Sequence, residues 1–115
     1  MEIKIKSIGD KGDLANERIG INVIKDSELK YYVLFMTSKT DNGFGNRSNK
    51  SYWFIPQEVK AGDEIVIYTK SGNASVKNKA DGTKTHFLYW GLDKPLFNND
   101  KDKIVLINAS SYQSF

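Results

Sequence analysis

Sulfur and imidazole chemistry are almost absent from this chain: its 115 residues include no cysteine and one histidine, His86. Without cysteine there is no disulfide, no thiolate metal ligand and no cysteine nucleophile, and one histidine excludes paired-histidine metal sites. No apolar run approaches the roughly eighteen residues that a membrane-spanning helix needs. Residues 1–6 alternate charged and apolar side chains, unlike a signal peptide. We therefore expect a cytoplasmic domain that does not enter a membrane.

Arginine is nearly as scarce as histidine. Only Arg18 and Arg47 among the 17 cationic residues are arginine, and 14 acidic residues leave a net charge of +3. Arginine is the usual reader of phosphates and base edges because its guanidinium makes two parallel hydrogen bonds. A surface dominated by lysine is more typical of a protein that its charge keeps soluble. The charge balance therefore favours a solvated surface over a nucleic-acid interface.

The dominant pattern alternates polar and apolar residues with a period of two. Six Phe, six Tyr and two Trp exclude a disordered chain, and the length fits one domain spanning residues 1–115. The alternating and aromatic runs predict strands at residues 2–8, 18–23, 29–37, 52–55, 64–69, 86–90 and 104–107, with residues 110–115 as a further candidate edge strand. No helical stripe of useful length is present, so the pattern predicts an all-β sandwich or barrel.

Two of these strands predict part of the core. Ile65, Ile67, Val105 and Ile107 occupy alternate apolar positions beside a turn, and we expect all four side chains to be buried. Two long polar stretches, residues 38–51 and 70–85, are rich in Gly, Asn and Ser and are predicted to be loops. Because long loops commonly carry function, we expect them to hold binding residues.

Three stretches, taken in order, resemble the lamin tail domain. In residues 17–34, a strand is followed by a segment in which Tyr32 stands where the family has Trp and Tyr31 replaces a Gly. Residues 52–68 contain an aromatic corner ending at Pro56 and then an Ala-Gly step into a strand. Residues 86–108 contain a strand with Trp90 and a closing strand after an Asn-Asn-Asp turn.

The resemblance implies an immunoglobulin-like β-sandwich of seven to nine short antiparallel strands. It also implies an interaction role, and it assigns no catalytic residue. The rod helix and the prenylation box of nuclear lamins are not in this sequence. The resemblance is therefore to a stand-alone bacterial or phage version of the domain.

The cations of the two long stretches are candidate binding residues. Residues 70–85 carry four lysines and one acid, a net charge of +3, and residues 38–51 carry three cations and one acid, a net charge of +2. If both stretches lie at one end of a sandwich, they form a basic rim for phosphate or an acidic protein surface; otherwise they are solvated loops. The candidates are Lys39, Arg47, Lys50, Lys70, Lys77, Lys79 and Lys84.

Trp53 and Trp90 are the other candidate binding residues. Each lies in an aromatic run whose neighbouring side chains point to opposite faces of the strand, so one member faces outward unless both faces are covered. Two interpretations are open for each tryptophan: a core aromatic, or a stacking platform for a sugar or single-stranded nucleic acid.

Catalytic and metal sites have little support. His86 begins an aromatic strand, and we expect it to satisfy a local hydrogen bond rather than to catalyse a reaction. The Asp and Asn residues at 93–102 lack EF-hand spacing, and turn chemistry explains them equally well. No phosphate loop, nucleophile elbow or metal-ligand pair is present. We expect no enzymatic activity, no metal and no cofactor.

Two hypotheses for function follow. The first is a non-enzymatic interaction module that binds a protein or another macromolecule through loops and an exposed strand face. The alternative is nucleic-acid or glycan binding through the basic loops and outward-facing aromatics.

Overall fold

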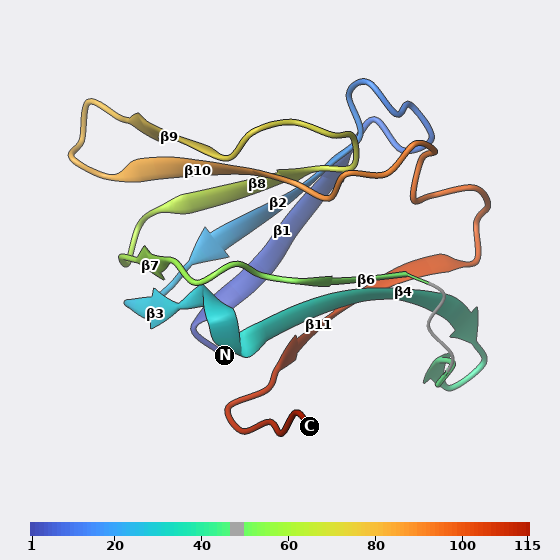
Figure 1. Ribbon diagram of the computed structural model, residues 1–115. Coiled ribbons are helices and arrows are strands. Elements are labelled where there is room, and N and C mark those ends of the chain that lie inside the picture. The colour runs from blue at the N-terminus through green and yellow to red at the C-terminus, as the bar shows by residue number, and fades with distance from the viewer. Residues whose placement is uncertain (47–49) are drawn as a thin grey trace.

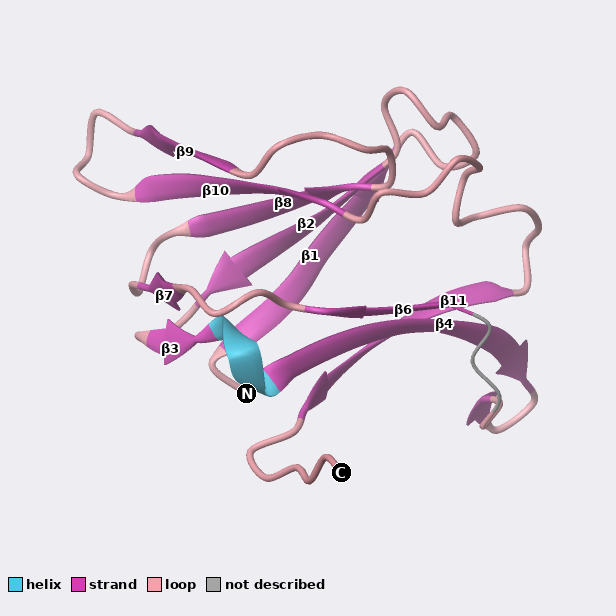
Figure 2. Ribbon diagram, in the orientation of Figure 1, coloured by secondary structure: helices cyan, strands magenta, loops and turns pink. Residues whose placement is uncertain are grey.

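The fold is built almost entirely from β-strands (Figure 1, Figure 2). The computed structural model describes residues 1–46 and 50–115. Within these residues the chain forms eleven strands and one short 3-10 helix, η1 (Leu29–Tyr31). The strands are β1 (Ile3–Gly9), β2 (Arg18–Val23), β3 (Ser27–Glu28), β4 (Tyr32–Thr40), β5 (Gly43–Phe44), β6 (Lys50–Trp53), β7 (Glu58–Val59), β8 (Glu64–Tyr68), β9 (Ser75–Asn78), β10 (Lys84–Tyr89) and β11 (Asp102–Asn108). No helix in the described part of the chain has the length and apolar content to cross a bilayer.

The larger sheet has the order β1-β2-β8-β10-β9 and mixes parallel and antiparallel pairs. β8 and β10 run parallel, with Glu64 opposite Thr85 and Tyr68 opposite Tyr89. The other pairs in this sheet are antiparallel. A parallel pair needs a crossover of a dozen or more residues, and the chain between Tyr68 and Lys84 provides it. The expectation of antiparallel pairing throughout therefore does not hold for β8 and β10.

The smaller sheet is centred on β4. β11 pairs antiparallel with one side of β4, from Asp102 opposite Ser38 to Asn108 opposite Tyr32. β6 pairs with the other side, and β5 forms a hairpin with the end of β4. β3 and β7 form a separate two-stranded ribbon. In Figure 1 the larger sheet lies above the layer formed by β4, β6 and β11.

The core fills the space between the two layers. Ile65 and Ile67 are 0% and 1% exposed, which confirms their predicted burial. The prediction for β11 is wrong, because Ile107 is 41% exposed and Val105 is half-buried, whereas Ile104 and Leu106 pack against the core. All four consecutive side chains are apolar, so alternation alone did not identify the inward face, and an error of one residue exchanges the two faces.

Several predicted boundaries also change. Residues 29–31 form η1, in which the Glu28 carboxylate accepts a hydrogen bond from the Lys30 amide, so β4 begins at Tyr32. The polar stretch at residues 70–85 contains β9 and the start of β10, so it is mostly a hairpin and not an open loop. Residues 110–115 form no strand. The strands outnumber the predicted seven to nine because β3, β5 and β7 are only two residues long.

Candidate functional site

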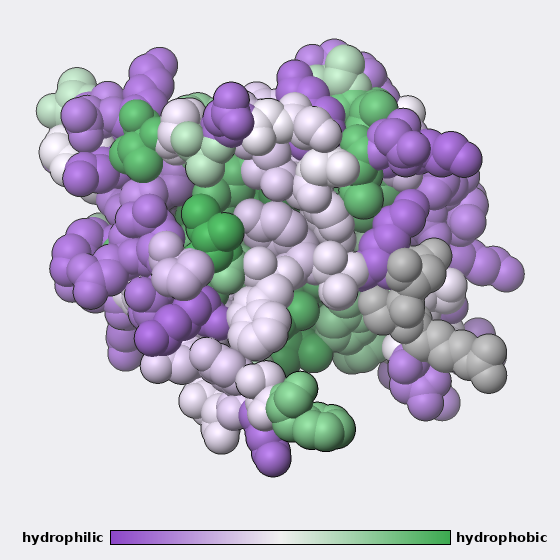
Figure 3. All heavy atoms as spheres, viewed as in Figure 1, coloured by the Kyte–Doolittle hydropathy of each residue, from purple (hydrophilic) through white to green (hydrophobic). Residues whose placement is uncertain are grey.

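The outward-facing side of the smaller sheet carries a continuous group of apolar side chains. Val33 of β4 lies between Trp53 of β6 and Ile107 of β11, and the next outward position pairs Phe35 with Val105. We call these five residues the outer apolar face. Trp53 and Ile107 are 53% and 41% exposed, and the other three are half-buried. In Figure 3, which views the layers from the side, apolar atoms are visible at the level of this sheet near the centre of the view.

Trp53 is held in place and is not a freely rotating surface side chain. Its indole Nε1–H donates a hydrogen bond to the carbonyl of Lys30 at 2.6 Å. Tyr112 of the C-terminal tail packs edge-on against the indole, with ring centroids 5.0 Å apart and planes at 87°. A fixed aromatic loses little conformational entropy on binding, so Trp53 is suited to anchor a partner.

Trp90 lies in a different environment. It is half-buried, packs against the core, and has its ring centroid 5.4 Å from that of Tyr52. Of the two candidate tryptophans, Trp53 is therefore the one that presents its ring to solvent.

One end of the outer apolar face is basic. Lys103 and Lys39 lie on the same side of their strands as Val105 and Phe35, next along the sheet. The Lys103 ammonium lies 6.0 Å from the ring centroid of Phe44. Lys50 begins β6 at the neighbouring edge, and Arg47 lies outside the described residues. An apolar centre with cations at one end favours a partner that is apolar and acidic.

The remaining candidate lysines lie elsewhere. Lys77, Lys79 and Lys84 belong to the β9–β10 hairpin, which extends away from the turn between β4 and β5 at the opposite side of the molecule (Figure 1). Lys79 is paired with Glu64, at 3.3 Å between Nζ and Oε1. Lys70 lies beyond the other end of β8, with its ammonium 5.1 Å from the ring centroid of Tyr68. The two polar stretches therefore do not form one basic rim.

The outward side of the larger sheet carries an aromatic cluster that sequence reasoning missed. Tyr68 stacks with Tyr89 at 5.5 Å between centroids and lies 6.5 Å from Phe87. A side chain at Gly72 would overlap the ring of Tyr89, at 2.4 Å from its nearest atom, so the backbone of Gly72 covers that ring. The cluster depends on the parallel β8–β10 pairing, which no local pattern predicts.

Asp63 and His86 form a buried polar pair inside the larger sheet. The Asp63 carboxylate lies 2.9 Å from His86 Nε2 and accepts hydrogen bonds from the Lys60 and Lys84 amides, both at 3.0 Å. Burial alone would raise the pKa of Asp63, but these hydrogen bonds, led by that of His86, outweigh it and lower the pKa. Nδ1 of His86 is buried without a partner. His86 is thus hydrogen-bonded, as expected, but its partner Asp63 lies 23 residues away along the chain and was not indicated by the sequence.

Glu17 is a second buried acid that the sequence did not indicate. Its side chain is fully buried, and Oε1 accepts hydrogen bonds from the Thr69 hydroxyl at 2.5 Å and the Leu96 amide at 2.7 Å. Oε2 accepts from the amides of Gly12 and Phe97 at 2.8 and 3.3 Å. The buried carboxylate thus joins three connecting segments through four hydrogen bonds.

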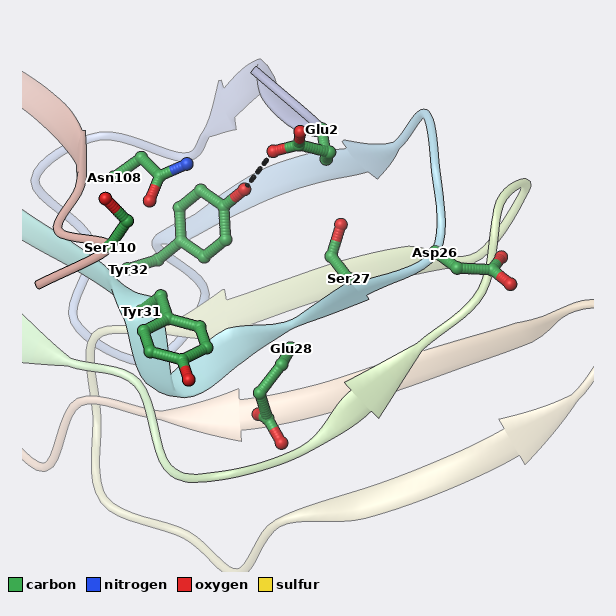
Figure 4. A pocket seen from close by; sticks show the side chains of 8 residues that line it. All are labelled: Glu2, Asp26, Ser27, Glu28, Tyr31, Tyr32, Asn108 and Ser110. Carbon is green, nitrogen blue, oxygen red and sulfur yellow. Dashed lines mark hydrogen bonds between the residues drawn. The ribbon is translucent and has the colours of Figure 1, made fainter.

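A hollow of about 350 Å³ lies beside β3 and η1, and most of its lining residues carry a carboxyl or hydroxyl group (Figure 4). Its lining residues are Glu2, Asp26, Ser27, Glu28, Tyr31, Tyr32, Asn108 and Ser110. The Tyr32 hydroxyl donates to Glu2 at 2.8 Å. Burial, together with the Glu2 carboxylate, raises the pKa of Tyr32 to about 12.

The acidic groups of this hollow are already engaged. Glu28 Oε2 accepts from the amides of Lys30 and Gln57 at 3.1 and 2.8 Å, and these bonds lower its pKa although burial opposes them. Asp26 accepts from the Ala61 amide at 2.9 Å. Figure 4 shows the three carboxylates spread around the hollow and not directed at one point. Across the described residues, no three Asp, Glu or His side chains are grouped to hold a metal ion.

The oxygen-rich residues near Asp102 form a turn. The carboxylate Oδ2 of Asp102 accepts from the amides of Asn98 and Asn99 at 2.6 and 3.0 Å, and Asn99 Oδ1 accepts from the Lys101 amide at 2.8 Å. These oxygens are used to close the chain reversal before β11, as turn chemistry predicts.

The outer apolar face is thus the candidate binding site. No protein-family model and no curated protein sequence matches this chain.

Proposed function

We propose that this protein is a non-enzymatic interaction module that binds another protein through the outer apolar face. The observation that carries the proposal is the exposure of Trp53 and Ile107 beside Val33, Phe35 and Val105 on one side of one sheet. A contiguous exposed apolar group of this kind is typical of an interaction surface in a monomeric domain. A rigid aromatic anchor at its edge adds to that support.

The partner we propose presents an apolar segment with acidic residues on one flank. Lys103 and Lys39 stand at one end of the outer apolar face, and the outward positions of β4, β6 and β11 include no Asp or Glu between Lys103 and Ile107. Complementary charge at the rim orients a partner and speeds association, while the apolar centre supplies most of the affinity.

We also propose that the fold is a lamin-tail-like, immunoglobulin-like sandwich. Two stacked layers of strands with a common core support the proposal, as does the order of the three resembling stretches along the chain. The parallel β8–β10 pair departs from an all-antiparallel sandwich. The lamin-tail resemblance implies an interaction role, which agrees with the function proposed above.

The nucleic-acid or glycan alternative has less support. The β9–β10 hairpin, which carries Lys77 and Lys79, lies on the opposite side of the molecule from the end of β4 that carries Lys39 (Figure 1), so their charges do not add in one patch. The stacked rings of Tyr68 and Tyr89 are partly covered by Gly72 and by each other, which leaves little free ring face for a base or a sugar.

The test is selection from a displayed random-peptide library. We expect enriched peptides that combine an apolar run with Asp or Glu on one side, and we expect Trp53→Ala to weaken their binding about tenfold or more. Val76→Ala is the matched control, because Val76 is 51% exposed on β9 of the other sheet. It should leave binding unchanged.

Two results would contradict the proposal. One is enrichment of peptides whose binding is insensitive to Trp53→Ala. The other is binding that falls steeply with salt, as counterion release at phosphates requires, since an apolar contact is much less sensitive to salt.

A further inference from the structure

The edge strands of this protein differ in how they are protected from pairing with another chain. β1 has a bulge between Ile5 and Ser7, and β9 is four residues long and fully exposed. β6 is also four residues long and is followed by Pro56. Short length, bulges, charge and proline are the usual devices that keep a sheet edge unpaired.

β11 has few of these devices. It is seven residues long and keeps an unbroken register with β4 from Asp102 to Asn108. Its central residues 104–107 are all apolar, and within the described chain it pairs with β4 alone. A long, regular, apolar edge is a ready template for another strand.

The backbone groups on the free side of β11 can be assigned. The Ala109 amide donates to the Tyr31 carbonyl at 2.6 Å, and the Lys101 carbonyl accepts from the Lys39 amide at 2.7 Å. The backbone amides and carbonyls of the odd-numbered residues of β11 therefore point toward β4. Because backbone groups alternate along a strand, the amides and carbonyls of Ile104 and Leu106 point to the free edge.

We propose that β11 is a self-association edge, at which a second copy of this chain adds its own β11 antiparallel about a two-fold axis at Val105. Val105 is the midpoint of Asp102–Asn108, so this register places all seven residues of the strand opposite residues of the second copy. The Asp102 amide already donates to the Asn99 carbonyl, so the inter-chain hydrogen bonds centre on Ile104 and Leu106. It makes Ile104 of one copy and Leu106 of the other a hydrogen-bonded pair, which matches the direction of their free backbone groups.

The side chains of β11 are self-complementary in this register. On the outward side, Val105 meets Val105 of the second copy, and Lys103 meets Ile107. On the core side, Ile104 meets Leu106, and at the ends Asp102 meets Asn108. No like charges stand opposite each other, and an isologous two-fold contact of this kind closes at a dimer. The proposal concerns the strand edge and does not depend on the identity of a partner protein.

The first measurement is the molecular mass of the full chain by sedimentation equilibrium, at concentrations up to about 1 mM. We expect a mass that rises toward that of a dimer. The amides of Ile104 and Leu106 should also become more protected from hydrogen exchange as the concentration rises. A monomer across the whole range would overturn the proposal.

A charge exchange tests the register. Ile107→Lys places the new lysine opposite Lys103 of the other copy twice in the dimer, but opposite Val33 within its own chain. We expect dimerisation to weaken about tenfold or more, because like charges directly opposite each other on paired strands repel. Adding Lys103→Glu should restore dimerisation, because each lysine then faces a glutamate of the other copy.

The control is Val76→Lys on β9, which adds the same charge to another exposed edge and should leave the dimer unchanged. Circular dichroism checks that each variant is folded. Dimerisation unaffected by Ile107→Lys, or not restored by the double variant, would overturn the proposed pairing.

Discussion

Asp63 and His86 hold each other inside the larger sheet: Nε2 of the imidazole lies 2.9 Å from the carboxylate, and each side chain is only 4% exposed. The same carboxylate receives the amides at the start of β10 and in the turn before β8. Gly62 in that turn has φ +91°, a conformation that other residues rarely adopt. The Asp63 carboxylate therefore fixes the turn before β8, the start of β10 and the orientation of the His86 ring.

Replacing Asp63 by Asn should destabilise the fold by about 1–3 kcal/mol. The NH₂ group of the asparagine would take the place of a carboxylate oxygen that accepts a hydrogen bond from the Lys60 or the Lys84 amide. The measurement is urea unfolding at neutral pH. Asn99→Asp, a conservative exchange in an exposed turn, is the control and should have little effect.

The stability contributed by the Asp63 charge should disappear in acid. Its pKa is lower in the folded protein than its ordinary value of 3.8, so the contribution is complete above that value and is lost as pH falls through the folded pKa. Between neutral pH and a pH below 4, the urea midpoint should therefore drop less for Asp63→Asn than for the natural chain. Equal acid sensitivity in both proteins would contradict this role.

Glu17→Gln should also destabilise the protein, by about 1–3 kcal/mol. The fully buried carboxylate accepts four hydrogen bonds, and a glutamine would turn one acceptor into a donor opposite an amide or a hydroxyl. Thermal unfolding measures the loss. Glu58→Gln, at an exposed position of β7, serves as the comparison.

Ile65→Ala should lower the stability of the fold far more than Ile107→Ala, because Ile65 faces the core and Ile107 faces outward. Ile65 is completely buried, and its truncation should cost about 2–5 kcal/mol. Ile107 is 41% exposed, and its truncation should cost less than about 1 kcal/mol. Denaturation midpoints give both values, and similar losses at the two positions would mean that β11 is turned the other way.

The Tyr32 phenol should ionise late in an alkaline titration followed by ultraviolet absorbance. Its pKa is raised from 10 to about 12 by burial and by the hydrogen bond to Glu2. Stability from the neutral phenol is therefore present below pH 10 and is lost as pH rises through about 12. Tyr32→Phe should reduce the absorbance change at the highest pH without abolishing it, because burial also raises the pKa of Tyr52. An unchanged curve would contradict the assignment.

Local patterns predicted much of the fold. Alternation located β1, β2, β8 and β10 and predicted the burial of Ile65 and Ile67, because a half-buried strand must alternate. It did not identify the inward side of β11, where both sides are apolar. Nor did it predict the parallel β8–β10 pair, because pairing partners are chosen by tertiary packing and leave no local pattern.

The binding surface was predicted only in part. Trp53 was a candidate because its neighbours alternate, but the sequence left open which aromatic faces outward. The basic stretches were expected to carry binding, and the fold separates Lys77 from Lys39. Glu17 was missed because its neighbours are polar, and two of its hydrogen-bond donors lie 79 and 80 residues further along the chain.

That long separation has a consequence for how the chain acquires its structure. During synthesis, β1, β2 and β8 can meet before residues 96 and 97 have been made, and the Glu17 carboxylate then lacks two of its four donors. Until residues 96 and 97 are available, the cost of removing the Glu17 carboxylate from water opposes closure of the end of the sheet over it. We therefore expect stable burial of Glu17 to require the last quarter of the chain. A fragment ending before Leu96 should show rapid amide exchange around Glu17 and Thr69.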